Sequence, residues 1–159
     1  MELKDKTLPG EPIQGNRTRA PLYAPNFFSS FGRPEPCTFC CSPPITGRRW
    51  KAIPGKQLAE EIIELKARFG FDMLRFQDAN FGVAEKRTKE LCQALVDLDA
   101  DVWWNGTIEI ETIMRYKDDL PEESKCHLLW LGAESGKAEM QERIGKNIGI
   151  DNIPIAYST

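Results

Sequence analysis

Two cysteines are the residues of this chain best suited to chemistry, and their spacing is typical of a metal-binding pair. They form the segment Cys37-Thr38-Phe39-Cys40, which follows Gly32-Arg33-Pro34-Glu35-Pro36 and precedes Cys41-Ser42-Pro43-Pro44. Glycine and proline at these positions predict a loop. Thiolates are soft ligands, and a short loop allows two of them to turn toward one iron or zinc ion. The spacing therefore predicts a metal or cluster site.

The remaining cysteines suggest no disulfide framework. Five cysteines are an odd number, and their spacing is irregular. Cys92 falls on the apolar side of an expected helix, and Cys126 directly precedes an expected strand, so both are expected to be small buried hydrophobes. The single histidine, His127, opens the same strand and is expected to be structural.

Length and composition limit the classes of function. The 159 residues suffice for one domain with a core, and the apolar content of 41% is that of a soluble globular protein. A net charge of −3 gives no basic surface for nucleic acid. No apolar run approaches the ~20 residues of a membrane span. Because the N-terminus is charged and no apolar signal region follows it, a cytoplasmic location is expected.

The elements that must position the cysteines alternate between strands and helices. Apolar periodicity predicts strands over 24–31, 72–76, 102–108 and 127–132, and helices over 56–69, 84–97, 110–116 and 137–144. In the helix over 56–69 the apolar residues recur at three- and four-residue steps, and Gly70 ends it. Four strand–helix units of this kind predict a parallel α/β sheet.

The carboxyl ends of these strands carry polar or small residues that would meet at one edge of the sheet, which forms the mouth of a binding site. Ligands of parallel α/β proteins gather at this edge. The first strand leads into the cysteine loop, and the others lead into Asp78, Thr107 and Glu134 within the segments 77–81, 105–109 and 132–136. This convergence predicts a binding site that draws one side chain or more from every strand.

Taken together, these segments resemble the radical S-adenosylmethionine (SAM) enzymes, in particular the group that carries an N-terminal cobalamin-binding domain. The resemblance runs from about Tyr23 to Gly149, and it rests on the segments 37–40, 47–50, 76–81, 103–107, 132–136 and 143–146. It implies a partial (β/α) TIM-barrel-like core with about four βα units of a six-unit barrel, over residues 23–149. Residues 1–22 are then expected to be a linker or arm, and residues 150–159 an irregular tail. The chain is expected to be an incomplete core.

The resemblance also implies cofactors and roles. Cys37 and Cys40 would ligate two irons of a 4Fe-4S cluster, whose open iron would bind SAM. Phe39 would lie near the adenine, Asp78 near the methionine amino group, and Glu134 near the ribose hydroxyls or the amino group, with Thr107 also in the cofactor site. Reductive cleavage of SAM would give a 5′-deoxyadenosyl radical for a methyl transfer, cyclisation or rearrangement. The implied partners are a small-molecule or peptide substrate and a reductant protein such as flavodoxin or ferredoxin, with cobalamin supplied through a domain absent from this chain.

The chain departs from the family pattern at one ligand. The first cluster cysteine would stand at position 33, where this sequence has Arg33. Arginine stays protonated and cannot coordinate iron in this setting. Cys41 is the candidate substitute, although neighbouring side chains in an extended segment point apart. A labile or absent cluster is therefore expected.

Several alternatives stay open on the sequence alone. The chain is compatible with a catalytically inactive fragment, or with a non-catalytic protein whose Cys37, Cys40 and Cys41 bind zinc or serve a redox role. Asp78 and Asn80 are also typical of loop residues that bond the backbone around them. Glu134 is also typical of a solvated residue near the start of a helix.

Overall fold

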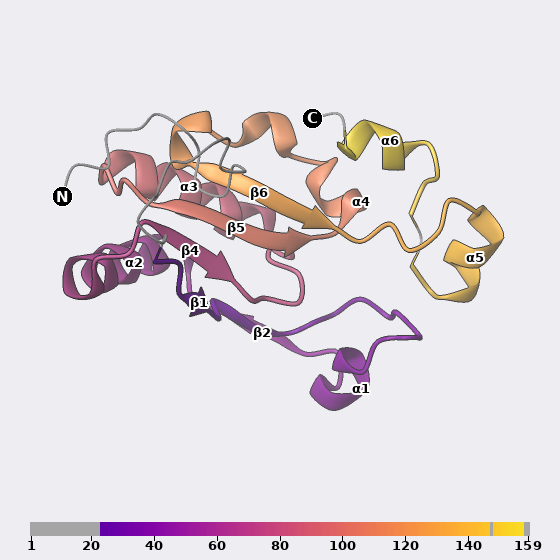
Figure 1. Cartoon of the computed structure of the whole chain (residues 1–159). Coiled ribbons are helices and arrows are strands. Elements are labelled where there is room, and N and C mark those ends of the chain that lie inside the picture. Colours follow the sequence, from indigo (N-terminus) through magenta and orange to yellow (C-terminus); the bar gives the residue numbers. More distant parts are fainter. Residues whose placement is uncertain (1–22, 147, 158–159) are drawn as a thin grey trace, which may run out of the picture.

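The computed structural model describes residues 23–146 and 148–157, so the arm expected over residues 1–22 lies outside the described residues. Its main sheet has four parallel strands in the order β1-β4-β5-β6, which are β1 (Asn26–Phe27), β4 (Met73–Phe76), β5 (Trp103–Ile108) and β6 (Cys126–Leu131). A separate antiparallel pair is formed by β2 (Ser30–Gly32) and β3 (Trp50–Ala52). Figure 1 shows this pair beside the first strand of the main sheet. The predicted α/β class with a parallel sheet is confirmed.

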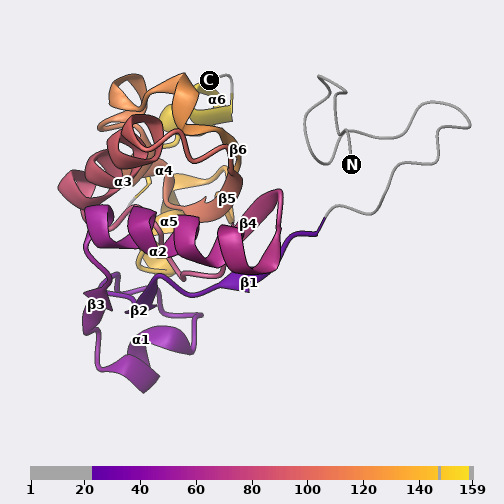
Figure 2. The same ribbon diagram turned by 90° about the vertical axis from the view of Figure 1, so that its left-hand side faces the viewer.

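Two long helices cover one face of the main sheet, as Figure 2 shows. They are α2 (Gly55–Phe69) and α3 (Glu85–Asp97), close to the predicted bounds. Leu58 and Ile62 of α2 are fully buried because their spacing keeps them on one side of the helix. Helix α2 ends at Gly70, which takes the left-handed conformation with φ of 66°.

Aromatic side chains fill the core between these helices and the strands. The ring centroids of Phe76 and Phe81 lie 4.6 Å apart, and those of Phe81 and Trp104 lie 5.1 Å apart. The indole N–H of Trp104 donates to the carbonyl oxygen of Ser124 at 2.8 Å. Trp103 lies on the opposite face of β5 and is only partly buried, as expected for neighbouring residues of a strand. This core fixes the ends of β4 and β5 in relation to each other.

The remaining helices are short. The predicted helices over 110–116 and 137–144 are shorter than expected, as α4 (Ile110–Ile113) and α5 (Ala138–Arg143). Single 3-10 turns span Lys117–Asp119 and Glu122–Ser124. Helix α1 (Ser42–Thr46) follows the cysteine loop and was not predicted. None of the helices within 23–146 and 148–157 has the length and apolarity needed to cross a bilayer.

The single strand expected over 24–31 is wrong, because the structure divides it. β1 pairs with β4 in parallel, whereas β2 turns away to pair with β3. The division falls at Ser29, whose hydroxyl donates to the carboxylate of Asp78 at 2.5 Å. The backbone N–H of Ser30 donates to the other oxygen of Asp78, also at 2.5 Å. These two bonds draw the chain out of the main sheet.

The irregular tail expected over 150–159 is also corrected, because Asn152–Tyr157 form helix α6. Pro154 falls in the first turn of α6, where its missing N–H removes no helical hydrogen bond. Ala156 is buried and packs with Ile110 and Ile113 of α4 in a second, smaller core. The hydroxyl of Tyr157 donates to the carbonyl oxygen of Leu131 at 2.7 Å, which ties α6 to the end of β6.

The last strand of the sheet, β6, has one largely exposed face. Leu128 and Trp130 of β6 are 43% and 45% exposed, and they alternate with the more buried Leu129 and Leu131. Within residues 23–146 and 148–157, β6 pairs with β5 alone and so forms an edge of the sheet. The exposure of Leu128 and Trp130 shows that, among the described residues, this face of β6 is largely open, in contrast to the covered face beneath α2 and α3.

Candidate functional site

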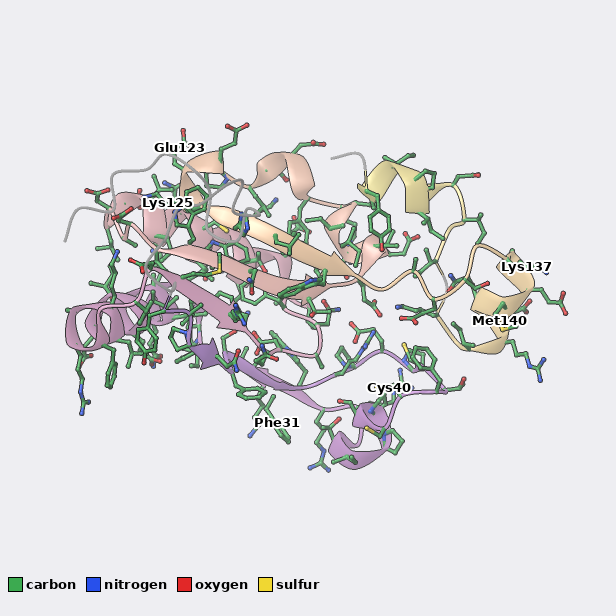
Figure 3. All side chains as sticks on the ribbon, in the orientation of Figure 1. Phe31, Cys40, Glu123, Lys125, Lys137 and Met140 are labelled. Carbon is green, nitrogen blue, oxygen red and sulfur yellow. The ribbon has the colours of Figure 1, made fainter. Side chains whose placement is uncertain are left out.

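The cysteine loop and α5 meet at the carboxyl ends of the parallel strands. The arrowheads of β4, β5 and β6 point toward this side in Figure 1. The backbone N–H of Thr38 donates to the carbonyl oxygen of Ile144 at 2.9 Å, which joins the loop to the end of α5. A Cβ atom on Gly145 would lie 3.0 Å from the carbonyl oxygen of Pro36, so the contact is close. In Figure 3, Cys40 of the loop lies on the same side of the molecule as Met140 of α5.

The three cysteines of the loop differ in exposure. Cys37 is 2% exposed, whereas Cys40 is partly buried and Cys41 is exposed at the start of α1. The sulfur of Cys40 accepts the backbone N–H of Ser42 at 3.5 Å. Burial raises the pKa of the Cys37 thiol, and the adjacent charge of Arg33 acts in the opposite direction. The most buried of the three is thus the one beside a fixed cation.

The other two cysteines lie away from this loop, in the core on α3 and on β6. Cys92 is fully buried, and burial raises the pKa of its thiol to about 11. Burial also raises the pKa of Cys126 to about 12, although part of that residue is accessible. The prediction that Cys92 is a small buried hydrophobe is confirmed, and Cys126 packs against the core as a partly buried one.

Arg33 lies between two carboxylates. Its Nε atom is 3.0 Å from Oε2 of Glu35, and its Nη2 atom is 2.5 Å from Oε1 of Glu109 at the end of β5. The side-chain amide of Asn80, beyond the end of β4, donates to Oε1 of Glu35 at 2.7 Å. Burial raises the pKa of Glu109, and the charge of Glu35 adds to that rise. A four-residue polar network therefore occupies the position of the expected first ligand.

A second ion pair lies at the end of β6. The side chain of Lys146 is 5% exposed, and its Nζ atom lies 2.9 Å from Oε1 of Glu134. The same ammonium group donates to the carbonyl oxygen of Gly132 at 2.7 Å. A Cβ atom on Gly132 would lie only 2.6 Å from Nζ, so any side chain there would displace the Lys146–Glu134 pair. Glu134 itself takes a left-handed backbone conformation, with φ of 60°.

The cysteine loop and Lys146 line one hollow, and Lys146 bonds Glu134, so Glu134 lies on the same side of the sheet as the cysteine loop. A cavity of about 200 Å³ is lined by Cys37, Gly145 and Lys146 together with the acidic residues Glu35, Glu109 and Glu111. Glu134 lies beside this cavity and bonds Lys146 of its lining. The sequence placed Glu109 at the end of its strand but gave it no role, and it gave none to Glu35 or Lys146. The signals were the position of Glu109 in the segment 105–109 and that of Lys146 in the segment 143–146.

Asp78 and Asn80 are engaged by the protein itself. Asp78 is 3% exposed, and both its carboxylate oxygens accept hydrogen bonds, from Ser29 and from Ser30. The side-chain oxygen of Asn80 accepts the backbone N–H of Gly82 at 3.2 Å, which is the loop bonding named as an alternative. Asp78 bonds a segment distant in sequence rather than its own loop. The structure thus gives both residues a role in shaping the mouth.

Thr107 and Phe39 are placed differently from each other. Thr107 lies in β5, partly buried, and its carbonyl oxygen accepts the backbone N–H of Phe81 at 2.8 Å. This bond anchors the loop that follows β4. Phe39 is 55% exposed between Cys37 and Cys40. An exposed aromatic ring at this edge offers an apolar surface for a ligand.

Known proteins provide an independent comparison. No protein-family model matches the chain. A curated relative, an uncharacterised methyltransferase of Pyrococcus horikoshii, is 28% identical over 120 residues, which are 76% of this chain and 26% of the relative. The chain therefore spans about a quarter of the length of this relative.

Two solved structures share the fold. One is the radical SAM methyltransferase TsrM from Kitasatospora setae with cobalamin and a [4Fe-4S] cluster bound, at a TM-score of 0.69 and 15% identity over 80% of this chain and 25% of that one. The other is the cobalamin-dependent SAM radical enzyme OxsB, at a TM-score of 0.63 and 17% identity over 85% of this chain and 22% of that one. The fold of this chain is thus that of a region of each of these two proteins.

The donor set of this chain does not fit a cluster held by three thiolates. Within the part of the chain that the structure describes, no group of three or more His, Cys, Asp or Glu side chains is arranged to hold a metal ion. Cys37 and Cys40 supply two thiols. Arg33, which is paired with Glu35 and Glu109, stands where the first cluster cysteine is expected. A guanidinium group repels iron and donates no lone pair to it.

Proposed function

We propose that this chain is a SAM-binding core of the radical SAM type, belonging to a protein that transfers a methyl group. The observation that carries the proposal is the convergence of Cys37, Glu109, Glu134 and Lys146 at the strand ends of a fold shared with TsrM and OxsB. The methyltransferase relative supports the same reaction class. In this proposal the parallel sheet is part of a (β/α) barrel.

The charge of the mouth favours this ligand. Glu35, Glu109, Glu111 and Glu134 provide four carboxylates, against the two cations Arg33 and Lys146. SAM carries a sulfonium and an ammonium group against one carboxylate, so its net charge is positive. A partly buried acidic site attracts such a ligand more strongly than a solvated one does, because the effective dielectric constant is lower. Phe39, between Cys37 and Cys40 in the sequence, offers an exposed ring for the adenine.

The test is calorimetric titration of the chain with SAM and with S-adenosylhomocysteine, which lacks the positive sulfur. SAM is expected to bind about tenfold more tightly, in keeping with one favourable charge contact in a half-buried site. The Glu134→Gln variant should lose most of this preference, and Glu60→Gln on the exposed side of α2 should keep it. Equal binding of the two ligands, or none of either, would contradict the proposal.

The proposal also covers the substrate, the reductant and the second cofactor. It comprises a substrate that is a small molecule or a peptide, a reductant such as flavodoxin or ferredoxin, and cobalamin supplied by a further domain. Radical cleavage of SAM requires a cluster, and Arg33 stands where one of its ligands is expected. Arg33 therefore favours a second candidate function, a catalytically silent core that keeps the SAM pocket. Anaerobic reconstitution with iron and sulfide separates the two, because only the active form gains stoichiometric iron.

A further inference from the structure

The four-residue network of Arg33, Glu35, Asn80 and Glu109, named here the arginine latch, ties three strand ends together. We propose that the arginine latch holds the cysteine loop on the ends of β4 and β5 without metal, and that Glu109 is the partner that arginine at position 33 requires. This inference concerns the loop itself and does not depend on SAM binding.

The geometry makes the latch a connection between distant segments. Arg33 and Glu109 are 76 residues apart in sequence, and their contact joins the loop after β2 to the end of β5. Asn80 and Glu35 are 45 residues apart, and their bond joins the same loop to the segment after β4. An iron cluster held by thiolates of this loop would tie the loop into the site by metal bonds. Here protein groups make the connection instead.

The charge balance explains why arginine fits. The Arg33 side chain is 12% exposed, and its guanidinium group contacts one carboxylate through Nε and another through Nη2. An arginine placed by chance among thiols would be a buried cation without a counter-charge, which is strongly unfavourable. Here Glu109 and Glu35 supply two negative charges at 2.5 Å and 3.0 Å. The charge of arginine at position 33 is therefore balanced by the two neighbouring carboxylates.

The same balance predicts the effect of restoring a cysteine. Arg33→Cys would remove the cation between Glu35 and Glu109, and a thiolate there would add a third negative charge. Neutralising Glu109 together with Arg33→Cys would remove part of that repulsion. Cluster assembly should therefore need changes at both positions.

Labelling of thiols tests the latch directly. Purified protein is treated with a maleimide before and after incubation with a chelator, and the labelling rate at each cysteine is measured by peptide mass spectrometry. Buried Cys37 is expected to react at least ten times more slowly than exposed Cys41, with the same rate before and after chelation. Arg33→Met should raise the Cys37 rate about tenfold, whereas Arg49→Met, at an exposed arginine next to β3, should leave it unchanged.

Controls within the same digest keep the result interpretable. Cys92 is fully buried in the core, so its labelling reports unfolding of the whole chain. If Arg33→Met unfolds the chain, the conservative Glu109→Gln carries the test, with the same expected rise at Cys37. The Arg33→Met/Glu109→Gln double variant should label no faster than the quicker single variant. Fast labelling of Cys37 in the unaltered chain, or a rate that rises on chelation, would overturn the latch.

Reconstitution tests the second half of the inference. Arg33→Cys and Arg33→Cys/Glu109→Gln are incubated with iron and sulfide without oxygen, and bound iron is counted per chain. The double variant is expected to retain at least twice the iron of the single variant. Equal iron in the two variants would show that Glu109 is not the required partner. A failure of SAM binding alone would leave both readouts unaffected.

Discussion

Beneath α2 and α3 the sheet buries rings such as Phe76 and Trp104, whereas at its carboxyl edge it buries charges such as Lys146. The two regions are built from the same strands, but different forces hold them. The covered face is stabilised by the removal of apolar surface from water, which needs no exact partner. The mouth is stable only if each charge meets an opposite one, as Lys146 meets Glu134. Changes in the first region should therefore affect folding, and changes in the second should affect ligands.

The largest effect is expected from the core. Trp104→Ala would leave a cavity beneath α3 and an unpaired carbonyl at Ser124. The free energy of unfolding should fall by about 3–5 kcal/mol, the usual cost of removing a large buried ring. Chemical denaturation measures it. Trp103→Ala, on the open face of the same strand, is the matched control and should cost much less. Equal losses would mean that the two faces of β5 are not different.

The second-largest effect is expected on SAM affinity, from a change at the mouth. Gly132→Ala would place a Cβ atom 2.6 Å from Nζ of Lys146 and 2.8 Å from Oε1 of Glu134. Both are ends of flexible side chains, so the pair should move apart with little cost to folding. SAM affinity should fall about tenfold, which corresponds to about 1.4 kcal/mol. Gly136→Ala is the control, because a Cβ atom there meets no atom within 4 Å. A large loss of stability in Gly132→Ala, with SAM affinity kept, would contradict the view that the mouth serves ligand binding rather than folding.

Asp78 lies at the border between the two regions. Asp78→Asn would present an amide to Ser29 and Ser30, which both donate to the carboxylate. One of these bonds must be lost, so stability should fall by about 1–3 kcal/mol. SAM affinity should change little, because the carboxylate is occupied by the protein. A strong loss of affinity in a stable variant would instead return Asp78 to the cofactor site that the sequence suggested.

The sequence predicted best what is local. The period of Leu58 and Ile62 and the stop at Gly70 determined α2 within one turn. Convergence of the strand ends was predictable because parallel strands share a polarity. The division between β1 and β2 was not, since it depends on Asp78, which is 49 residues from Ser29.

The polar pairs of the mouth were hidden for the same reason. Arg33 was recognised as a missing ligand, but its partner Glu109 lies 76 residues away and leaves no periodic pattern. Lys146 and Glu134 are 12 residues apart on either side of α5. The short elements α1 and β3 contain too few residues to show a period.

The smallest expected effect is the change in stability with pH that Glu109 causes. Burial and the charge of Glu35 raise the pKa of Glu109 above its ordinary value of 4.5. The folded state therefore binds this proton more tightly than the unfolded state does, so the contribution of Glu109 to stability is fully present below pH 4.5 and is lost as the pH rises through the raised pKa. Glu109→Gln should remove this dependence, measured as the difference in melting temperature between the two proteins across that window. Because Arg33 and Lys146 face the same carboxyl and lower its pKa, the difference should be small, and Arg33→Met should enlarge it. A difference that has the opposite sign would mean that the cations, rather than burial, dominate the mouth.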